Sequence, residues 1–580
     1  MKIKKILSGA ALFSVLTANL LLFPFYAESK VFAAAQEPVR AQNAMVASQH
    51  ELASQIGIEI LKKGGNAVEA AIAVGFALAV VYPEAGNIGG GGFMLIARKD
   101  GTLDAIDYRE KAPKAAHRDI FVDSNGELIK GEGSSTIGYR ASGIPGTVAG
   151  FELAYKKFGS GKVSWRELVA PAQKLAANGY RLSHRLAELM YSYRETLSKY
   201  PESNRIFLRN GNYYKEGEIF RQPELAQTLS RIARQGAWDF YHGVTARKIA
   251  ADMKANGGLI TLKDLADYKA VERKPLRGTY RGYEIITMPP PSSGGAVMLE
   301  VLNILERYDI ASMGPNSAAK THVLVEAMRR AFADRAEYMA DPDFAEVPVE
   351  KLISKSYAEK RGSDIDLKSA SNSKNIGPGE VTITEGNDTT HFTVVDKDGT
   401  VVSNTYTIND LYGSRVTIKG AGFLMNDEMD DFAARPGKPN LFGLVQGERN
   451  KVEPGKRPLS SMTPTIVRRR DGRIWFAVGA RGGPRIISAV LQTVINVIDF
   501  GMDIQEAIDF PRIHHQWLPD EIAFERYGLS LDTMKILSSY GHKFASRPGS
   551  IASATGIMIS EDGVRFGAID SRSDGKAIGY

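Results

Sequence analysis

The stretch Asn387-Asp388-Thr389-Thr390-His391-Phe392-Thr393 opens a run of alternating apolar residues that predicts a β-hairpin over residues 391–408. Threonine is common in strands, so a threonine pair at a strand start is ordinary by itself. If the chain is cut before Thr389, however, that residue carries both a hydroxyl and a free α-amine. The amine can then take the proton of its own hydroxyl, which makes a nucleophile. These residues alone do not separate Thr389 from Thr390.

Composition sets limits on the class of protein. The chain has 580 residues, of which 43% are hydrophobic, and its formal net charge is +7. This length suits a large globular protein of two or more structural units. The absence of cysteine excludes disulfides, thiol nucleophiles and cysteine metal sites. The small charge excess gives no indication of nucleic-acid binding.

The first 35 residues predict export. Lys2, Lys4 and Lys5 precede an apolar stretch, and Ala33-Ala34-Ala35 supplies a small-residue cleavage pattern before Gln36. The alternative is an N-terminal membrane anchor, but polar residues and Pro24 interrupt the apolar stretch. No other run approaches the length of about 20 apolar residues that spans a bilayer. We therefore expect a signal peptide over 1–35, a secreted or periplasmic protein, and no membrane span in its mature form.

Periodicity gives a coarse order of elements. We expect helices over 45–63 and 67–81, a mainly helical region over 147–340, and a mobile loop over 362–386, which is rich in polar residues. Strands are expected over 93–97, 103–108, 391–408, 474–478 and 556–569, with a long apolar helix over 484–500. The run Gly89-Gly90-Gly91-Gly92 leads into a strand and lacks a following Gly-Lys-Ser/Thr, so it indicates close backbone packing rather than a phosphate loop. Two sheets covered by helices fit this order.

Several ordered motifs resemble the γ-glutamyltransferase (γ-glutamyl transpeptidase) family of N-terminal-nucleophile hydrolases. They are Asp107-Tyr108-Arg109-Glu110-Lys111-Ala112-Pro113, Met288-Pro289-Pro290-Pro291-Ser292-Ser293-Gly294-Gly295, Asp388-Thr389-Thr390-His391-Phe392, Thr405-Tyr406-Thr407-Ile408-Asn409, Asn426-Asp427-Glu428-Met429-Asp430-Asp431-Phe432 and Arg457-Pro458-Leu459-Ser460-Ser461-Met462-Thr463-Pro464. The resemblance extends from about residue 40 to Tyr580.

The resemblance implies an α+β fold, a four-layer αββα sandwich. It also implies self-cleavage at Asp388-Thr389 into a large subunit (36–388) and a small subunit (389–580), which together form one αββα unit as a heterodimer. Thr389 is then the nucleophile. The implied donors are glutathione and other γ-glutamyl compounds, and the acceptors are amino acids, peptides or water. No metal or cofactor is implied.

Each implied site residue has chemistry that suits its role. Arg109 is expected to bind the donor α-carboxylate with its forked guanidinium, helped by Ser460 and Ser461. The alternative for Arg109 is a surface ion pair with Glu110. The donor α-ammonium needs acceptors, which are expected to be Asn409, Glu428 and Asp431. Asp430 is adjacent to Asp431, so the assignment is open to an error of one residue. Many relatives have glutamine at the position of Glu428.

Four further positions concern the reacting atoms. Thr407 resembles the second threonine of the family, which hydrogen-bonds the nucleophile; its alternative is a plain strand residue. Gly482 and Gly483 resemble the oxyanion-hole glycines, whose N–H groups hold the developing negative charge. The sequence departs from the family pattern just before them, because Ala480-Arg481 stands where Ser-Pro is usual. Arg481 places an unexpected cation near the site.

Two features carry weaker expectations. Residues 435–450 resemble a lid over the donor pocket, with Phe442 at the aromatic position, and an ordinary long loop is the alternative. The nine histidines form no ligand cluster in the sequence, and the adjacent pair His514-His515 is a poor chelate.

Two rival functions remain open from the sequence. One keeps the fold but acts as an amidohydrolase on poly-γ-glutamate or cephalosporin-type side chains. The other is an exported solute-binding protein with an inactive site. Self-cleavage that depends on Thr389 separates both enzyme functions from the binding protein.

Overall fold

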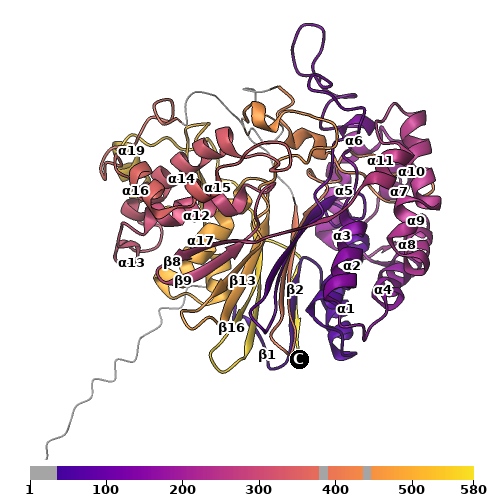
Figure 1. Ribbon diagram of the computed structural model, residues 1–580, viewed down its shortest axis with the longest axis horizontal. Helices are drawn as coiled ribbons and strands as arrows, with labels where there is room; N and C mark the ends of the chain where they lie inside the picture. The colour runs from indigo at the N-terminus through magenta and orange to yellow at the C-terminus, as the bar shows by residue number, and fades with distance from the viewer. Residues whose placement is uncertain (1–34, 378–388, 436–439, 441–443, 445) are drawn as a thin grey trace, which may run out of the picture.

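Two seven-stranded sheets lie face to face at the centre of the protein (Figure 1). The structure is a computed structural model that describes residues 35–377, 389–435, 440, 444 and 446–580. The first sheet has the order β1 (Val39–Ala41), β17 (Arg565–Ile569), β16 (Ser553–Ile559), β13 (Ile474–Arg481), β12 (Thr465–Arg468), β9 (Tyr283–Thr287), β8 (Leu276–Tyr280). The second has the order β18 (Lys576–Gly579), β2 (Met45–Ser48), β10 (Thr390–Val395), β11 (Val401–Thr407), β3 (Gly91–Ala97), β4 (Leu103–Asp107), β7 (Val271–Arg273).

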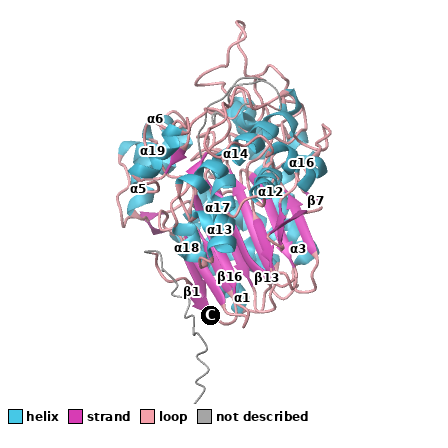
Figure 2. Cartoon of the chain, turned by 90° about the vertical axis from the view of Figure 1, so that its left-hand side faces the viewer, coloured by secondary structure: helices cyan, strands magenta, loops and turns pink. Residues whose placement is uncertain are grey.

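Helices cover both outer faces. Beside the second sheet lie α1 (Glu51–Lys62), α2 (Ala67–Val81), α3 (Thr147–Phe158), α4 (Trp165–Asn178), α5 (His184–Ser192), α8 (Pro223–Gln235), α9 (Ala237–Tyr241) and α10 (Val244–Ala255) (Figure 1). Beside the first sheet lie α12 (Gly294–Leu305), α14 (Ala318–Tyr338), α16 (Lys355–Arg361), α17 (Arg485–Phe500), α18 (Ile504–Asp509) and α19 (Leu531–Ser539) (Figure 2). The predicted αββα sandwich is therefore confirmed.

Apolar residues fill the spaces between the layers. All residues of α2 are buried, which explains why its sequence is apolar on every side. One core cluster joins α2 and its neighbours to β10 and β11, with Phe392 and Val394 among its members. A second cluster fills the space between the sheets and below α12, α14 and α17. The strand that follows Thr389 is thus held between two cores.

The four-glycine run packs closely against backbone, as predicted. A Cβ atom at Gly89 would lie 2.1 Å from the carbonyl oxygen of Leu424, and one at Gly90 would lie 1.9 Å from that of Thr407. At Gly92 the nearest atom would be the Cβ of Tyr406, at 2.4 Å. The run lets β3 approach the end of β11 more closely than any side chain permits.

Two expectations about elements need correction, and one needs an addition. The helix expected over 45–63 begins only at Glu51, because Met45–Ser48 pairs as β2 with both β10 and β18. The region 147–340 is mainly helical, as expected, and it also contains the short strands β7, β8 and β9. The loop expected to be mobile over 362–386 is partly anchored: Ser373 is buried, and its carbonyl accepts a hydrogen bond of 2.8 Å from the Trp517 indole.

The predicted signal peptide lies outside the described residues, apart from Ala35. Among the helices that the structure describes, none combines the length and apolar composition needed to cross a bilayer.

Candidate active site

Thr389 lies at the entrance to β10, opposite the last residue of β11. The antiparallel register pairs Thr390 with Tyr406, which brings the neighbouring Thr389 beside Thr407. The Thr389 hydroxyl donates a hydrogen bond of 3.4 Å to the Thr407 hydroxyl. Thr389 is buried and lines a small cavity of about 20 Å³, whereas Thr390 is a residue of β10 and is not among the lining residues. The geometry therefore separates two threonines that the sequence left equivalent.

The cavity gathers nine of the ten residues named from the sequence. Its lining contains Arg109, Thr389, Thr407, Asn409, Glu428, Asp431, Ser460, Ser461 and Gly483, together with Leu444, Met462, Pro484 and Ile486. Gly482, the tenth, is the neighbour of Gly483 at the end of β13 but is not part of the lining.

Arg109 is fully buried and is held by acidic side chains. Its guanidinium forms ion pairs with Glu428 and Asp431, and it lies 3.5 Å from Glu110. Its Nε donates to the carbonyl oxygen of Pro458 at 3.2 Å. A surface ion pair with Glu110, the alternative from the sequence, is therefore wrong. In the structure the residues expected to bind the two charges of a donor bind each other.

The carboxyl groups around Arg109 have raised pKa values. Burial raises the pKa of Glu110 to about 7, although the nearby Arg109 opposes this. Burial also raises the pKa of Glu428 well above its usual range and raises that of Asp431, again against the effect of Arg109. Three buried carboxyl groups thus share one guanidinium, and burial favours the protonated form of each of them.

Asp430 and Asp431 face different partners. Asp431 lines the cavity and contacts Arg109. The Asp430 carboxylate accepts a hydrogen bond of 2.5 Å from the Ser135 hydroxyl and is not among the lining residues. Asp431 is therefore the aspartate of this pair that faces the cavity.

The two serines are fixed by the proline-rich loop and by α14. The Ser460 N–H donates to the carbonyl oxygen of Pro291 at 2.9 Å, and the Ser460 carbonyl accepts from the Ser293 N–H at 2.8 Å. The Ser461 hydroxyl accepts a hydrogen bond of 3.1 Å from Arg335. Arg335 also donates to the Ser293 hydroxyl at 2.8 Å. The proline-rich motif thus acts as a support for Ser460.

Asn409 adopts a backbone conformation that non-glycine residues seldom use. Its φ is 75°, in the left-handed region. Its N–H donates to the Thr407 hydroxyl at 2.8 Å, and its side-chain amide donates to the Asp427 carbonyl at 3.1 Å. The Thr407 hydroxyl therefore contacts both Thr389 and Asn409, which fixes its position beside the candidate nucleophile.

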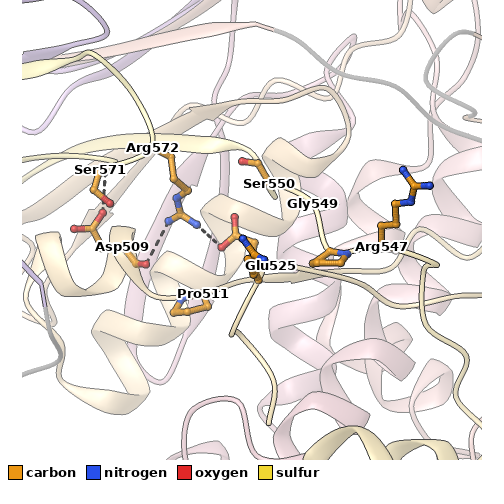
Figure 3. A pocket seen from close by; sticks show the side chains of 10 residues that line it. Asp509, Pro511, Glu525, Arg547, Gly549, Ser550, Ser571 and Arg572 are labelled. Atoms are coloured by element: carbon orange, nitrogen blue, oxygen red, sulfur yellow. Dashed lines mark hydrogen bonds and ion pairs between the residues drawn. The ribbon is translucent and has the colours of Figure 1, made fainter. Parts of the chain in front are cut away.

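The glycine pair connects β13 to α17. Gly482 has a φ of 135° and Gly483 a φ of 53°, so both use backbone conformations that favour glycine. A Cβ atom at Gly482 would lie 2.8 Å from the Cα of Ala552. The loop that carries Ala552 is held in turn by Glu525, whose carboxylate accepts from the Ile551 N–H at 2.8 Å and pairs with Arg572. Figure 3 shows Glu525 paired with Arg572; both residues line a separate cavity of about 660 Å³.

The lid prediction falls mainly outside the described residues, and so does Phe442. Of the described part, Leu444 lines the cavity, and its N–H donates to the Asn440 side chain at 3.0 Å. The Gln446 side chain donates to the Asp431 carbonyl at 2.9 Å. The segment therefore touches the candidate site, while its action as a lid stays a prediction.

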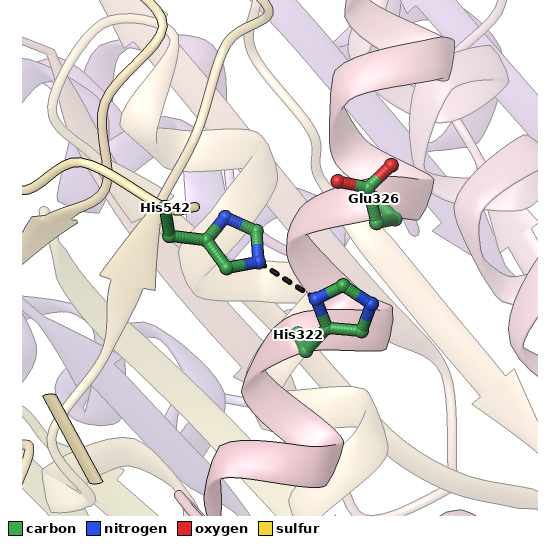
Figure 4. A group of neighbouring side chains, drawn as sticks. All are labelled: His322, Glu326 and His542. Carbon is green, nitrogen blue, oxygen red and sulfur yellow. Dashed lines mark hydrogen bonds between the residues drawn. The ribbon is translucent and has the colours of Figure 1, made fainter. Parts of the chain in front are cut away.

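One histidine cluster was not expected. His322 and Glu326 of α14 lie beside His542, and their potential ligand atoms are within 4.8 Å of one another (Figure 4). His322 Nε2 donates to the Asp366 carbonyl at 2.7 Å, so its Nδ1 accepts from His542 at 2.7 Å. Glu326 already pairs with Arg329 and Arg330. A metal ion here would face two guanidinium groups, so we interpret the cluster as a joint between α14 and the C-terminal region.

Comparison with known proteins agrees with the resemblance in the sequence. The family model described as gamma-glutamyltranspeptidase matches residues 53–580. The chain belongs to this family. It is 48% identical over 545 residues to the glutathione hydrolase proenzyme of Escherichia coli (strain K12), covering 94% of this chain and 93% of that protein.

Two proteins that are named as acylases are also similar to this chain. It is 36% identical over 552 residues to the Acylase ACY 1 proenzyme of Pseudomonas sp. (strain SE83), covering 94% of this chain and 95% of that protein. Among solved structures, the cephalosporin acylase from Bacillus halodurans matches with a TM-score of 0.83 and 27% identity, covering 96% of this chain and 99% of that one.

The sequence did not indicate Arg335, which contacts Ser461, or the apolar residues that line the cavity. Arg335 lies in α14, whose sequence otherwise resembles a core helix, and its side chain is fully buried. A basic residue on a buried helix face was the available signal. Leu444, Met462 and Ile486 carry no such signal, because apolar residues are equally common in any core.

Proposed function

We propose that this protein is a secreted γ-glutamyltransferase and glutathione hydrolase that produces its own nucleophile by cleaving the Asp388–Thr389 bond. The observation that carries this proposal is the Thr389 hydroxyl, which lies 3.4 Å from that of Thr407 in a cavity also lined by Arg109 and Asp431. Family membership supports the reaction class, and the apolar N-terminal segment supports export.

Processing needs only the residues at the junction. The Thr389 hydroxyl attacks the carbonyl carbon of Asp388. The peptide C–N bond breaks, the nitrogen takes the hydroxyl proton, and an ester joins Asp388 to Thr389 Oγ. Water hydrolyses this ester and leaves the Asp388 carboxylate and a free Thr389 amine. An α-amine has a pKa of about 8, which suits a base near neutral pH.

Donor binding exchanges ion partners inside the cavity. The donor head carries one α-carboxylate and one α-ammonium. The carboxylate binds Arg109 with hydrogen bonds from Ser460 and Ser461, and the ammonium binds Asp431, Glu428 and Asn409. Arg109 and Asp431 pair with each other in the structure. When the donor binds, its carboxylate takes the place of Asp431 beside Arg109, and its ammonium takes the place of Arg109 beside Asp431. Neither buried charge is then left without a partner.

Catalysis repeats the attack of the Thr389 hydroxyl on a carbonyl carbon, now with the free Thr389 amine as the base. The Thr389 amine takes the proton of its own hydroxyl, whose oxygen attacks the γ-carbonyl of the donor. The backbone N–H groups of Gly482 and Gly483 stabilise the oxyanion. The donor amide breaks, its amine leaves with a proton, and a γ-glutamyl ester forms on Thr389. An amino acid, a peptide or water then takes the γ-glutamyl group.

The similarity to acylases favours a second candidate, an amidohydrolase of cephalosporin-type side chains. The charge of the cavity discriminates between the two. An acyl group without an ammonium offers no cationic partner to Glu428 and Asp431. These two carboxylates would then repel the carboxylate of the acyl group and weaken its binding. Three carboxyl groups around Arg109 fit a zwitterionic γ-glutamyl head better. Family membership also argues against the solute-binding alternative.

The decisive experiment compares wild type with Thr389→Ala and Thr390→Ala. We expect purified wild type to release glutamate and cysteinylglycine from glutathione, and to form γ-glutamyl peptides when an acceptor is added. Thr389→Ala should lose activity at least about 10⁴-fold, as expected when an attacking group is removed. Thr390→Ala is the matched control and should retain activity. Full turnover by Thr389→Ala, or cleavage of a glutaryl amide but of no γ-glutamyl amide, would overturn the proposal.

A further inference from the structure

A donor carboxylate that binds beside Arg109 enters a site that already holds three carboxyl groups. Glu428 and Asp431 form ion pairs with the Arg109 guanidinium, and Glu110 lies 3.5 Å from it. Like charges repel, so the donor carboxylate needs further hydrogen-bond donors. Under the proposed function one of these is the hydroxyl of Ser461, which lines the cavity. A serine hydroxyl has a single proton, so its value as a donor depends on where that proton points.

Arg335 fixes the direction of the Ser461 proton. Arg335 is 1% exposed and is not among the lining residues, and its Nη2 donates to the Ser461 hydroxyl oxygen at 3.1 Å. A guanidinium can only donate, so Ser461 must use a lone pair for this contact. The proton of Ser461 therefore points away from Arg335. The Ser461 backbone is also fixed, because its carbonyl accepts from the Thr463 hydroxyl at 2.9 Å.

The same arrangement is already complete at Ser293. Arg335 Nε donates to the Ser293 hydroxyl oxygen at 2.8 Å, and the Ser293 hydroxyl donates onward to the Ser460 carbonyl at 2.7 Å. One guanidinium therefore binds two serine hydroxyls, and the first of them passes its own proton to an acceptor. We expect the second, Ser461, to do the same with an acceptor in the cavity.

Arg335 also lies close enough to the cavity for its charge to act there. Burial raises the pKa of Asp431, and the charges of Arg109 and Arg335 oppose this rise. Asp431 lines the cavity and is expected to bind the donor ammonium. The location of Arg335 beside the donor site is thus supported by its effect on Asp431 as well as by its hydrogen bonds.

We propose that Arg335 is a positioning residue that makes the enzyme specific for donors with a free α-carboxylate, because it holds Ser461 as an acceptor and so directs the Ser461 proton to that carboxylate. This inference rests on the proposed function. Arginine suits the position because Nε and Nη2 of its rigid planar fork reach the hydroxyls of Ser293 and Ser461 together. Lysine has the charge but lacks the fork.

The test compares two donors that differ only in the recognised group. They are γ-glutamyl-p-nitroanilide and its α-carboxamide analogue, and the release of p-nitroaniline gives kcat/KM for each. For wild type we expect kcat/KM for the carboxylate to exceed that for the carboxamide at least about 10-fold, the typical effect of a hydrogen bond to a charged group. Arg335→Gln should reduce this ratio at least about 5-fold, mainly through a higher KM for the carboxylate. The ratio is internal to each preparation, so partial loss of active protein does not affect it.

A double-mutant cycle tests whether Arg335 acts through Ser461. Ser461→Ala should reduce the ratio at least as much as Arg335→Gln does. Adding Arg335→Gln to Ser461→Ala should then change the ratio less than about 2-fold, because the group that Arg335 positions is already absent. Two reductions that multiply in the double variant would overturn the inference.

Arg335→Lys is the conservative variant, and its ratio should lie between those of wild type and Arg335→Gln. If Arg335→Gln yields no folded protein, Arg335→Lys decides alone. A reduced ratio then supports the inference, and a wild-type ratio overturns it.

Arg329 provides the matched controls. It is also buried in α14, but it binds Glu326, Ser373 and Asp520. Arg329→Gln and Arg329→Lys should keep the wild-type ratio. The inference is overturned if these variants lower the ratio as much as the same changes at Arg335, if Arg335→Gln keeps the wild-type ratio, or if wild type does not discriminate between the two donors.

Failure of the proposed function is recognised separately. If wild type cleaves neither donor, the proposed function is wrong, and calorimetric binding of glutamate and of its α-amide to wild type and Arg335→Gln still decides the role of Arg335. A preference of wild type for glutamate that Arg335→Gln loses supports the role. A preference that Arg335→Gln keeps, or a wild type that binds both compounds equally or binds neither, overturns it.

Discussion

At the scale of single residues, Asp431 and Asp430 offer a matched pair. Asp431 contacts Arg109 in the cavity, whereas Asp430 accepts from Ser135 outside the lining. A hydrogen bond to a charged group contributes about 1.5–3 kcal/mol, so Asp431→Asn should raise the KM for a γ-glutamyl donor about 10- to 100-fold. Asp430→Asn should change it less than about 3-fold, because the amide can still accept from Ser135. Equal effects in steady-state kinetics would contradict this assignment.

Glu110 predicts how stability depends on pH. Its pKa is raised from an ordinary 4.5 to about 7, mainly by burial. Between these values the folded protein binds more protons than the unfolded chain, so this group's contribution to the free energy of unfolding falls as pH rises from about 4.5 to about 7. The total effect is on the order of 1–3 kcal/mol. Glu110→Gln should show a smaller fall in melting temperature over this window. An unchanged pH profile in thermal denaturation would refute the role of Glu110.

At this scale, a residue could be assigned to the candidate site from the sequence where its type carries chemistry. Arg109, Asp431 and Ser461 could be named because their types suit a zwitterionic ligand and stand in motifs. The pairing of Arg109 with Asp431 could not be predicted, because it depends on segments that meet only in the fold. Arg335 and its contact with Ser461 were missed for the same reason.

At the scale of elements, the close contact between β3 and β11 controls the position of Thr407. A Cβ atom at Gly90 would lie 1.9 Å from the Thr407 carbonyl oxygen. Gly90→Ala should therefore displace Thr407 relative to Thr389 and reduce kcat about 100-fold, which is the typical cost of a displacement of about 1 Å. Gly549→Ala is the control, since a Cβ atom added at Gly549 would meet nothing within 4 Å. Steady-state kinetics that show equal rates for both variants would contradict this account.

Elements with a clear hydrophobic periodicity, or with a long apolar run, were predicted with the correct type. The hairpin that follows Thr389 and the apolar helix α2 both have the expected type. The strand β2 was missed because its four residues also fit an amphipathic helix, and only pairing with β10 and β18 decides between the two. Short segments of this kind depend on partners that are distant in the sequence.

At the scale of the whole molecule, the proposed cut would not separate the subunits. β10 and β11 lie inside a sheet whose other strands come from residues before the proposed cut, except for the edge strand β18. The first sheet also contains strands from both sides of the proposed cut. We expect the two chains of the cleaved protein to elute together in size-exclusion chromatography and to separate only under denaturing conditions. Elution of the small subunit alone from native buffer would contradict this arrangement.

The most direct test of the central claim is the intact mass of purified wild type and of Thr389→Ala. The account predicts two chains for wild type, with Thr389 as the first residue of the shorter one, and one uncleaved chain for Thr389→Ala. A shorter chain that begins at another residue, a Thr389→Ala protein that still divides at this position, or an uncleaved wild type with full activity would contradict it.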